Sequence, residues 1–332
     1  MKNAQVTGMG HYVPENIITN HDLEKMMDTS DEWIRERTGI VERRWVTPGE
    51  ETINGMGYKA SLMALEQAGM TPEDIDFIVF ASIVSDMGFP GGGCLMQEKL
   101  GIPGVPCMDI RNACSGFMYA LAVGDKFIKT GTYKTVLVVG SEIQSLGIDK
   151  STRGRDISVI FADGAGAVIL SATDNPHKGI LTTHLHADGR YARKLYCEWP
   201  SIHHTPGQNP VYDDPEHNFP HMEGRFVFKH AVVRFPEVIM EALQATGYTP
   251  ADLDLFIPHQ ANQRITEAVA ARLEIPMEKV MNTIVHYGNT TAATIPMAMS
   301  MAKQEGKIRD GSLVCLAAFG SGFTWGSALI RF

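Results

Sequence analysis

One cysteine lies where a reactive thiol is expected. Cys114 stands between an extended apolar run that ends near Arg111 and an apolar helix predicted over residues 115–129. The first turn of a helix carries partial positive charge and unpaired N–H groups, which favour a thiolate. Small residues on both sides of Cys114 would let a carbonyl group approach the sulfur closely. This local context also fits a buried, inert cysteine, so it leaves both interpretations open.

A histidine and an asparagine could complete a site around such a thiol. His259 ends the predicted strand LFIPH, and Asn289 follows Gly288 in a turn that leads into another helix. All three side chains would then lie at the carboxyl ends of strands, where open α/β sheets bind ligands. Imidazole and amide groups can stabilise negative charge that develops on a substrate oxygen. We therefore predict Cys114, His259 and Asn289 as catalytic residues.

An internal repeat supports this grouping. ALEQAGMTPEDID (64–76) recurs as ALQATGYTPADLD (242–254), and the two Thr-Pro turns are 178 residues apart (249 − 71). LGIP (100–103) recurs as LEIP (273–276), and KTVLVVGSE (134–142) resembles SLVCLAAFGSG (312–322). Each copy reads as a helix, a turn and a buried strand, which is typical of α/β folds with mainly parallel sheets. The repeat therefore predicts a duplicated βαβ-rich architecture.

The repeat also suggests a division of the chain. We place the halves at 1–174 and 175–332, because a polar segment with Pro and Gly separates them. LGIP precedes Cys114 by 11 residues (114 − 103) and LEIP precedes Asn289 by 13 (289 − 276), so the two occupy nearly equivalent places. The Pro- and His-rich segment 197–223 breaks the symmetry and is expected to be a long functional loop.

Composition excludes several other classes of protein. The net charge of −9 argues against a general nucleic-acid binder, and no apolar stretch is long enough to cross a membrane. Five scattered cysteines and an N-terminus without a signal sequence indicate a reducing, cytoplasmic setting. His203, His204, His217 and His221 do not have the spacing of a zinc site, so no metal is predicted.

Several motifs together carry a family resemblance. DIRNACSGF, IPHQANQRI, HYGNTTAA and the closing AAFGSGFTWGSALIRF resemble β-ketoacyl-acyl-carrier-protein synthase III of the thiolase superfamily, as do TSDEWIRERTGI (29–40) and FADGAGAVIL (161–170). The resemblance implies a five-layered αβαβα fold and a homodimer. It also implies decarboxylating condensation of an acyl-CoA primer with malonyl-acyl carrier protein, through a Cys114 thioester and without a cofactor.

The same resemblance assigns further residues. It implies an oxyanion hole formed by the backbone amides of Cys114 and Ser321. It also implies contacts to CoA from Trp33, Arg37, Arg153, Gly224 and Asn262, an acyl pocket closed across the dimer by Phe89, and carrier-protein docking by Lys229, Arg264 and Arg272.

Some features leave the substrates open. Three glycines follow Phe89 (91–93), and the 197–223 loop is longer than expected for the family, so a longer, branched or aromatic primer is an alternative to acetyl-CoA. A further alternative is a related enzyme with a CoA or small-molecule acceptor. Another is a cysteine thioester hydrolase. A thiolase is disfavoured because the C-terminal glycine loop FGSGF lacks a second cysteine.

Overall fold

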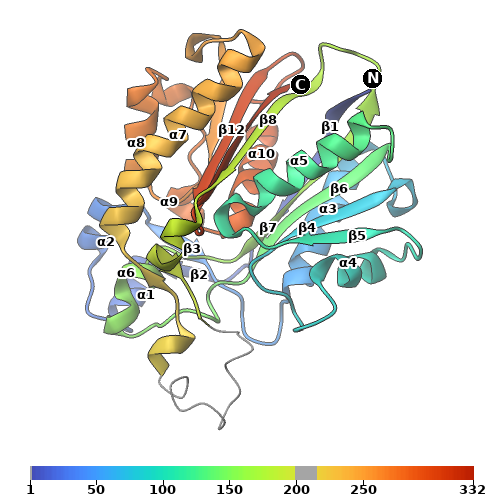
Figure 1. Ribbon diagram of the computed structural model, residues 1–332. Helices are drawn as coiled ribbons and strands as arrows, with labels where there is room; N and C mark the ends of the chain where they lie inside the picture. Colours follow the sequence, from blue (N-terminus) through green and yellow to red (C-terminus); the bar gives the residue numbers. More distant parts are fainter. Residues whose placement is uncertain (1, 199–214) are drawn as a thin grey trace.

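The computed structural model describes residues 2–198 and 215–332, which form five layers of alternating helices and sheets (Figure 1). The first sheet has the order β1 (Asn3–Tyr12), β7 (Gly164–Thr173), β6 (Thr135–Glu142), β4 (Phe77–Ala81) and β5 (Cys107–Ile110). The second has the order β11 (Leu255–Pro258), β12 (Leu313–Gly320), β13 (Thr324–Arg331) and β8 (Gly179–Ala187).

Helices cover both sheets and fill the space between them. The outer layers are α3 (Ile53–Ala68) with α4 (Gly92–Leu100) on the first sheet, and α7 (Gly224–Thr246) with α8 (Gln263–Arg272) on the second. The middle layer is α5 (Gly116–Lys129) and α10 (Thr294–Gln304), which contact both sheets. Both helices are largely buried because each packs against the two sheets, and α5 carries its charged residues, Asp125, Lys126 and Lys129, near its C-terminal end.

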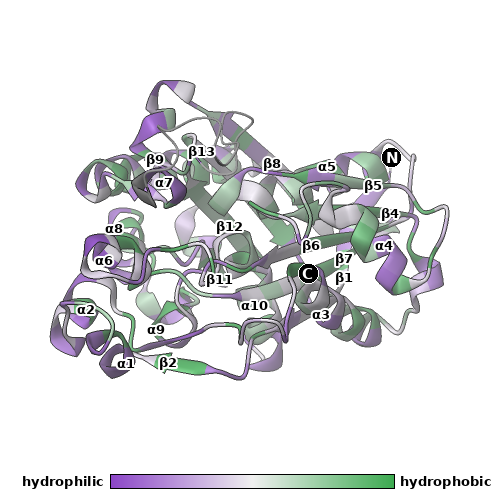
Figure 2. Ribbon diagram, turned by 90° about the horizontal axis from the view of Figure 1, so that it is seen from below, coloured by the Kyte–Doolittle hydropathy of each residue, from purple (hydrophilic) through white to green (hydrophobic). Residues whose placement is uncertain are grey.

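Shorter elements surround this core. They are β2 (Ile17–Thr19), α1 (Asn20–Glu24), α2 (Asp31–Thr38), β3 (Glu42–Arg44), η3 (Thr152–Gly154), α6 (Arg155–Ser158), η4 (Gly189–Lys194), β9 (Leu195–Tyr196), η6 (Pro215–Asn218), β10 (His221–Met222), η8 (Met277–Lys279) and α9 (Ile284–Tyr287). Figure 2 shows hydrophilic colouring on the peripheral helices α2 and α6, which lie outside the layered core.

The sheets are mixed, and the parallel pairs lie at one end of each sheet. The pairs β4–β5, β4–β6 and β11–β12 are parallel, and the other four pairs of the two large sheets are antiparallel. Parallel pairing is therefore less dominant than the sequence indicates. The reason is that β13 turns back directly beside β12, β7 returns beside β6 after the segment that carries η3 and α6, and β1 and β8 pair antiparallel with β7 and β13.

The duplication is visible in the topology. Reading from β1 in one sheet and β8 in the other gives matching positions, β1-β7-β6-β4 and β8-β13-β12-β11. The turns η1 (Pro72–Asp74) and η7 (Pro250–Asp252) each carry a Thr–Asp capping box. In the first half β5 pairs with β4. At the corresponding place in the described part of the second half there is an isolated bridge between Phe256 and Val280. The two halves thus repeat one pattern with one strand reduced.

The structure corrects the predicted equivalence of Cys114 and Asn289 in the two halves of the repeat. The turns η2 (Ala113–Ser115) and η9 (Thr291–Ala293) precede the two middle helices, and both start at a residue with positive φ, 45° at Ala113 and 53° at Thr291. The shift of 178 residues that relates the Thr-Pro turns relates these turns as well. The counterpart of Cys114 is therefore Ala292, and Asn289 corresponds to Arg111. Counting from LGIP and LEIP misses this because the intervening connections differ in length.

Candidate active site

Cys114 lies in the buried turn η2, between the edge strand β5 and the middle helix α5. The end of β12 passes directly over it, since a Cβ added to Gly320 would lie 2.6 Å from the Cβ of Cys114. Only glycine allows this approach without displacing the cysteine. The glycine loop after β12 and the nucleophile turn therefore form one compact unit built from both halves.

Burial of the thiol favours its protonated form. Burial raises the pKa of Cys114 to about 12, the charge of Glu142 raises it as well, and hydrogen bonds from the backbone amides of Cys114 and Ser321 act in the opposite direction. The expectation that the helix end would favour a thiolate is therefore wrong for the resting site, because desolvation outweighs the helix end and the two amides.

His259 follows β11 and is buried. Its backbone N–H donates to Ala317 O of β12 (2.8 Å), and its Nδ1 lies 2.6 Å from Thr294 Oγ1 at the start of α10. The Thr294 hydroxyl donates to Thr291 O (3.1 Å), so it accepts from Nδ1–H, which leaves the lone pair on Nε2. Burial lowers the pKa of His259 to about 3, and the ring is therefore neutral.

Within the described residues, Nε2 of His259 has no hydrogen-bond partner although it is buried. A buried imidazole nitrogen without a partner is unusual, since buried polar atoms are almost always paired. An atom of this kind, held by Thr294 from the other side of the ring, is available to a substrate or to a proton in transit.

Asn289 is buried at the turn before η9. Its backbone N–H donates to Ile160 O (2.9 Å), and its carbonyl accepts from the Ala162 N–H (2.9 Å). Its side-chain Oδ1 accepts from the Thr291 N–H (2.8 Å), which identifies the other side-chain atom as the NH₂ group. The amide is thus oriented with its oxygen used internally and its donor end left for another partner.

The turns bring these residues to one place. η2 packs against η9 and against β12, and the Thr294 partner of His259 follows η9 directly. The buried residues Cys114, His259 and Asn289 and the half-buried Ser321 therefore belong to one cluster between the two sheets. Ser321 donates its hydroxyl to Leu195 O (2.5 Å), which leaves its backbone amide facing the sulfur of Cys114.

The predicted nucleotide residues gather around α2 and α6. Trp33 is half-buried on α2, and the guanidinium of Arg37 lies 4.7 Å from its ring centroid. Arg155, which the sequence analysis missed, lies at the same distance from the ring and donates to Asp28 O (2.7 Å). Arg153 is exposed and donates to Asp149 (2.6 Å). The cluster combines an aromatic ring with three cationic groups, a combination suited to a nucleotide.

Gly224 and Asn262, two of the predicted CoA-contacting residues, lie at helix N-termini. Gly224 is exposed and opens α7. Asn262 caps α8 by accepting from the Arg264 N–H (2.9 Å), and its Nδ2 donates to Arg37 O (2.9 Å). The Asn262 side chain is thus engaged in holding α8 to the end of α2.

Phe89 is the most exposed large apolar side chain described, at 89%. In the chain it lies between β4 and α4. An exposed phenylalanine is not part of an acyl pocket within this chain alone, so any such role requires a second subunit.

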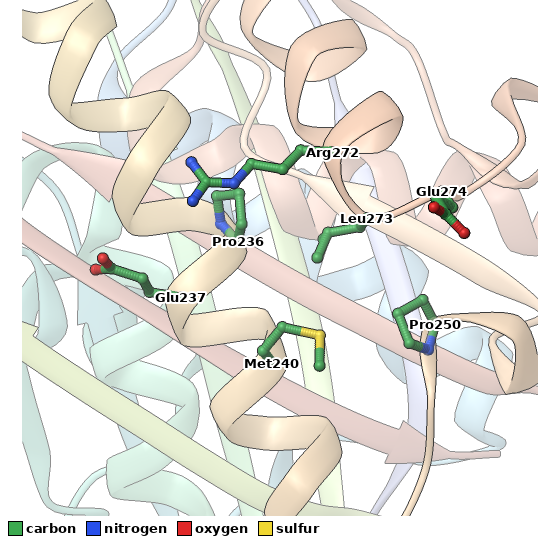
Figure 3. A pocket seen from close by; sticks show the side chains of 7 residues that line it. All are labelled: Pro236, Glu237, Met240, Pro250, Arg272, Leu273 and Glu274. Atoms are coloured by element: carbon green, nitrogen blue, oxygen red, sulfur yellow. The ribbon is translucent and has the colours of Figure 1, made fainter.

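The predicted docking residues Lys229, Arg264 and Arg272 are exposed on α7 and α8. Arg272 extends from α8 toward α7, where it donates to Val232 O (3.1 Å), and it borders a surface pocket of about 400 Å³ (Figure 3). The pocket is lined by Pro236, Glu237, Met240, Pro250, Arg272, Leu273 and Glu274. It lies on the outer helix layer, away from the buried cysteine cluster.

The histidine-rich segment is only partly described. His203 and His204 lie outside the described residues, whereas His217 bonds Glu198 (2.7 Å) and His221 stacks on Tyr196. Within residues 2–198 and 215–332 no group of side chains is arranged to hold a metal ion. No helix in that part of the chain is long and apolar enough to cross a membrane.

Two further residues of the cluster were not predicted. Thr294 orients His259, and the charge of the buried Glu142 raises the pKa of Cys114. Glu142 does have a sequence signal, because it ends a strongly apolar run whose repeat copy ends at Gly320. A carboxylate after such a strand is expected at the ligand-binding edge of the sheet.

These features define a class of protein. Two similar α/β halves, with a buried thiol before a middle helix and a glycine loop over it, are those of a thiolase-like condensing enzyme. The family described as 3-oxoacyl-[acyl-carrier-protein] synthase III matches residues 108–189, and its C-terminal part matches residues 243–332. The chain belongs to this family and is an acyltransferase.

Individual relatives agree over the whole length. The β-ketoacyl-[acyl-carrier-protein] synthase III of Alkalilimnicola ehrlichii is 46% identical and matches 100% of both chains. The crystal structure of 3-oxoacyl-[acyl-carrier-protein] synthase III from Aquifex aeolicus is 42% identical with a TM-score of 0.91, over 99% of this chain and 100% of that one. A priming β-ketosynthase from the R1128 polyketide pathway is 31% identical with a TM-score of 0.91, over 99% and 96%.

Proposed function

We propose that the chain condenses an acyl-CoA primer with malonyl-acyl carrier protein, giving a 3-oxoacyl-acyl carrier protein, CoA and CO₂ through a Cys114 thioester. The observation that carries this proposal is the pair of backbone amides, from Cys114 and Ser321, that both point at the Cys114 sulfur. Two preorganised N–H donors beside a nucleophile are what a thioester carbonyl needs when it becomes tetrahedral.

In the first half-reaction Cys114 attacks the acyl-CoA carbonyl. Because the thiol is protonated, its proton must leave as the S–C bond forms. The lone pair of His259 Nε2, which has no hydrogen-bond partner among the described residues, can accept this proton. The two amides stabilise the oxyanion, and CoA leaves as a thiolate that takes a proton from water. The products are acyl-Cys114 and a protonated His259.

In the second half-reaction the malonyl thioester loses CO₂ and becomes an enolate. His259 Nε2–H and the Asn289 NH₂ group can both donate to its oxygen. The enolate carbon attacks acyl-Cys114, the 3-oxoacyl product forms, and the expelled Cys114 thiolate takes the proton from His259. One proton is consumed from solvent per cycle, which matches the loss of one carboxylate as CO₂.

The nucleotide end of CoA is assigned to the α2–α6 region. Trp33 supplies a ring for the adenine, and Arg37, Arg153 and Arg155 supply charge for phosphate groups. Gly224 and Asn262 lie at the N-termini of α7 and α8, where the first backbone N–H groups of a helix can bind the carbonyl groups of pantetheine. Acyl-CoA acts here as a substrate, and no cofactor is required by the chemistry.

The acidic carrier protein is assigned to the outer helices α7 and α8. Lys229, Arg264 and Arg272 are exposed there, a local concentration of positive charge on a chain of net charge −9. Such patches steer an acidic partner toward a site and lose strength in salt.

A homodimer is proposed from the edge of the first sheet. Among the described residues β5 ends the sheet, Met108 of β5 is exposed, and Met87 and Phe89 are exposed in the segment between β4 and α4. Unpaired edges with apolar side chains are normally covered by a partner. We also propose that the two halves of the chain meet at residues 174/175 and that the protein is located in the cytoplasm.

The test uses intact-mass measurement. The protein is incubated with a panel of straight, branched and aromatic acyl-CoAs, and an acyl adduct on Cys114 is expected with at least one of them. Addition of malonyl-acyl carrier protein should then discharge the adduct as 3-oxoacyl carrier protein. Cys315→Ala, which removes another buried cysteine, should still form the adduct. An absence of adducts refutes the thioester, and release of free acid alone identifies a hydrolase.

A further inference from the structure

A run of three glycines (91–93) lies where α4 begins and has no role in the proposed reaction. A Cβ added to Gly92 would lie 2.5 Å from the ring of Phe80 on β4. A Cβ added to Gly93 would lie 3.0 Å from the Cβ of Cys107 on β5. The start of α4 therefore lies directly on the first sheet, at a distance that only glycine allows without a shift of the neighbouring residues.

This close approach brings two thiols together. Cys94 lies in the first turn of α4, and its Sγ is 3.4 Å from the Sγ of Cys107 at the start of β5. Both residues are free cysteines. Since bonded sulfur atoms are about 2.0 Å apart, the two atoms must approach by roughly 1.4 Å to form a disulfide. Small side-chain rotations in α4 and β5 are enough for a movement of this size.

The two thiols differ in their access to solvent. Cys94 is exposed, whereas Cys107 is half-buried against the apolar residues beneath α3 and α4. Burial, the Cys94 thiol and the charge of Asp109 together raise the pKa of Cys107 to about 12. An oxidant in solution therefore meets Cys94 first. Once Cys94 is modified its thiolate charge is gone, so Cys107 loses one of the groups that disfavour its own ionisation.

The pair lies on the side of the sheet that faces away from Cys114. Alternate residues of a strand face the same way, so Cys107 and Asp109 both face α4, and the Asp109 carboxylate accepts from the Gly93 N–H (3.1 Å). Cys114 precedes α5, which covers the other face of β4 and β5 (Figure 1). Chemistry at Cys94 and Cys107 is therefore separated from the cysteine cluster by the sheet itself.

We propose that Cys94 and Cys107 form a reversible modification site, at which a low-molecular-weight disulfide oxidises the two thiols to an intramolecular disulfide that fastens the start of α4 to β5. In the first step the Cys94 thiolate attacks one sulfur of the oxidant, and one thiolate leaves. In the second step the Cys107 sulfur attacks the Cys94 sulfur of the mixed disulfide, and the second thiolate leaves. The two cysteine protons pass to the two released thiols, and the oxidant gains the two electrons that the protein loses.

The free dithiol is the resting form of this site. In a reducing compartment disulfides are rare and are usually transient, so the bond forms only when the oxidant accumulates, and thiols reverse it. The two cysteines are 13 positions apart (107 − 94), and α4 itself forms most of the connection. Neither Cys114 nor a substrate takes part, so the site is independent of the proposed condensation.

The test treats the full chain with oxidised glutathione under native conditions and maps its peptides by mass spectrometry without reduction. Every sample carries Cys197→Ser, which removes the other exposed cysteine. With Cys94 and Cys107 both present, the chain should lose two hydrogen atoms, retain no glutathione and give one cross-linked pair of peptides. Dithiothreitol should restore both thiols.

The two matched variants separate the two steps. Cys107→Ser should retain glutathione on Cys94, because the second thiol is missing. Cys94→Ser should leave Cys107 unmodified, with reaction at least about tenfold slower than at Cys94. Cys107→Ala replaces Cys107→Ser if serine at this half-buried position prevents folding. Hydrogen exchange in the first turn of α4 should slow by about threefold or more in the oxidised chain, because its start is then fixed to β5.

Three outcomes would overturn the proposal. The first is a stable glutathione adduct on Cys94 beside an intact Cys107 thiol, which would show that the two sulfur atoms do not meet. The second is a covalent dimer on a non-reducing gel, which would place the bond between subunits. The third is two unchanged thiols after prolonged treatment with excess oxidised glutathione. Acyl adducts on Cys114 are measured separately, so failure of the condensation leaves this test unaffected.

Discussion

The turns η2 and η9 share a backbone shape and differ in chemistry. Both are short 3-10 turns that start at a residue with positive φ and lead into a buried middle helix. The first presents the Cys114 thiol beneath Gly320, and the second presents the methyl group of Ala292 near Glu142. A duplicated fold can therefore hold a nucleophile in one half and the groups that assist it in the other.

The asymmetry extends to the flanking residues. Asn289 is buried with an oriented amide, whereas its counterpart Arg111 is exposed. His259 follows β11, and the chain after the corresponding strand β4 supplies Ser82 and Ile83, which bind Glu142. The first half therefore holds the nucleophile and its charge environment, and the second half holds the hydrogen-bond donors.

Removal of the nucleophile should have the largest effect. Cys114→Ala is expected to reduce condensation by at least about 10⁴-fold, because the covalent step is lost. Adding Ala292→Cys to that variant should not restore an acyl adduct, since the strand end beside that turn carries Glu142 in place of Gly320 and its loop. Product formation by mass spectrometry checks both statements. Adduct formation at residue 292 would mean that the two turns are chemically interchangeable.

Asn289→Ala should slow condensation by about 10²–10³-fold while leaving acylation of Cys114 intact, because one donor to the enolate is removed. The matched variant Arg111→Ala changes the exposed counterpart and should remain within about twofold of the wild type. A burst of CoA release, measured separately from turnover with malonyl-acyl carrier protein, distinguishes the two half-reactions. Loss of the burst in Asn289→Ala would contradict a role limited to the second step.

Two glycines allow a comparison of close approaches. In Gly320→Ala the new Cβ would lie 2.6 Å from the Cβ of Cys114, and in Gly140→Ala it would lie 2.6 Å from the carbonyl oxygen of Ala292. Each should lower the free energy of unfolding by about 1–3 kcal/mol through overpacking, measured by urea denaturation. Only Gly320→Ala should slow acylation, because only that change displaces the nucleophile. Equal slowing by both would remove the distinction between the turns.

The pH dependence of stability should differ between the halves. The folded pKa of His259, about 3, lies below its ordinary value of 6.5, so the unfolded chain binds more protons between these values. This group should therefore lower the free energy of unfolding by about 2 kcal/mol as the pH falls from 8 to 5. Glu142 has a raised pKa, so its contribution falls as the pH rises between its ordinary value of 4.5 and about 8.

Urea denaturation at pH 5 and pH 8 tests this difference. His259→Gln should lose the acid-side decrease, and Glu142→Gln should lose the decrease toward pH 8. An unchanged pH dependence in His259→Gln would show that the ring is not held neutral by burial.

The amino-acid sequence by itself determined the identity of the catalytic groups and the repeated architecture. Residue types at strand ends, such as Cys114, His259 and Asn289, are visible because buried strands are continuous apolar runs and the residues after them stand out. The Thr-Pro turns and the glycine loop are local features as well, so their repetition could be seen without any coordinates.

Only the tertiary structure decided the state of those groups. The protonation of Cys114, the lone pair on His259 Nε2 and the involvement of Glu142 depend on burial and on which amides and hydroxyls from distant segments meet them. The true counterpart of Cys114, Ala292, likewise emerged from backbone shape rather than from counting residues between motifs. Desolvation and hydrogen bonding between the halves are non-local, and a linear pattern does not encode their balance.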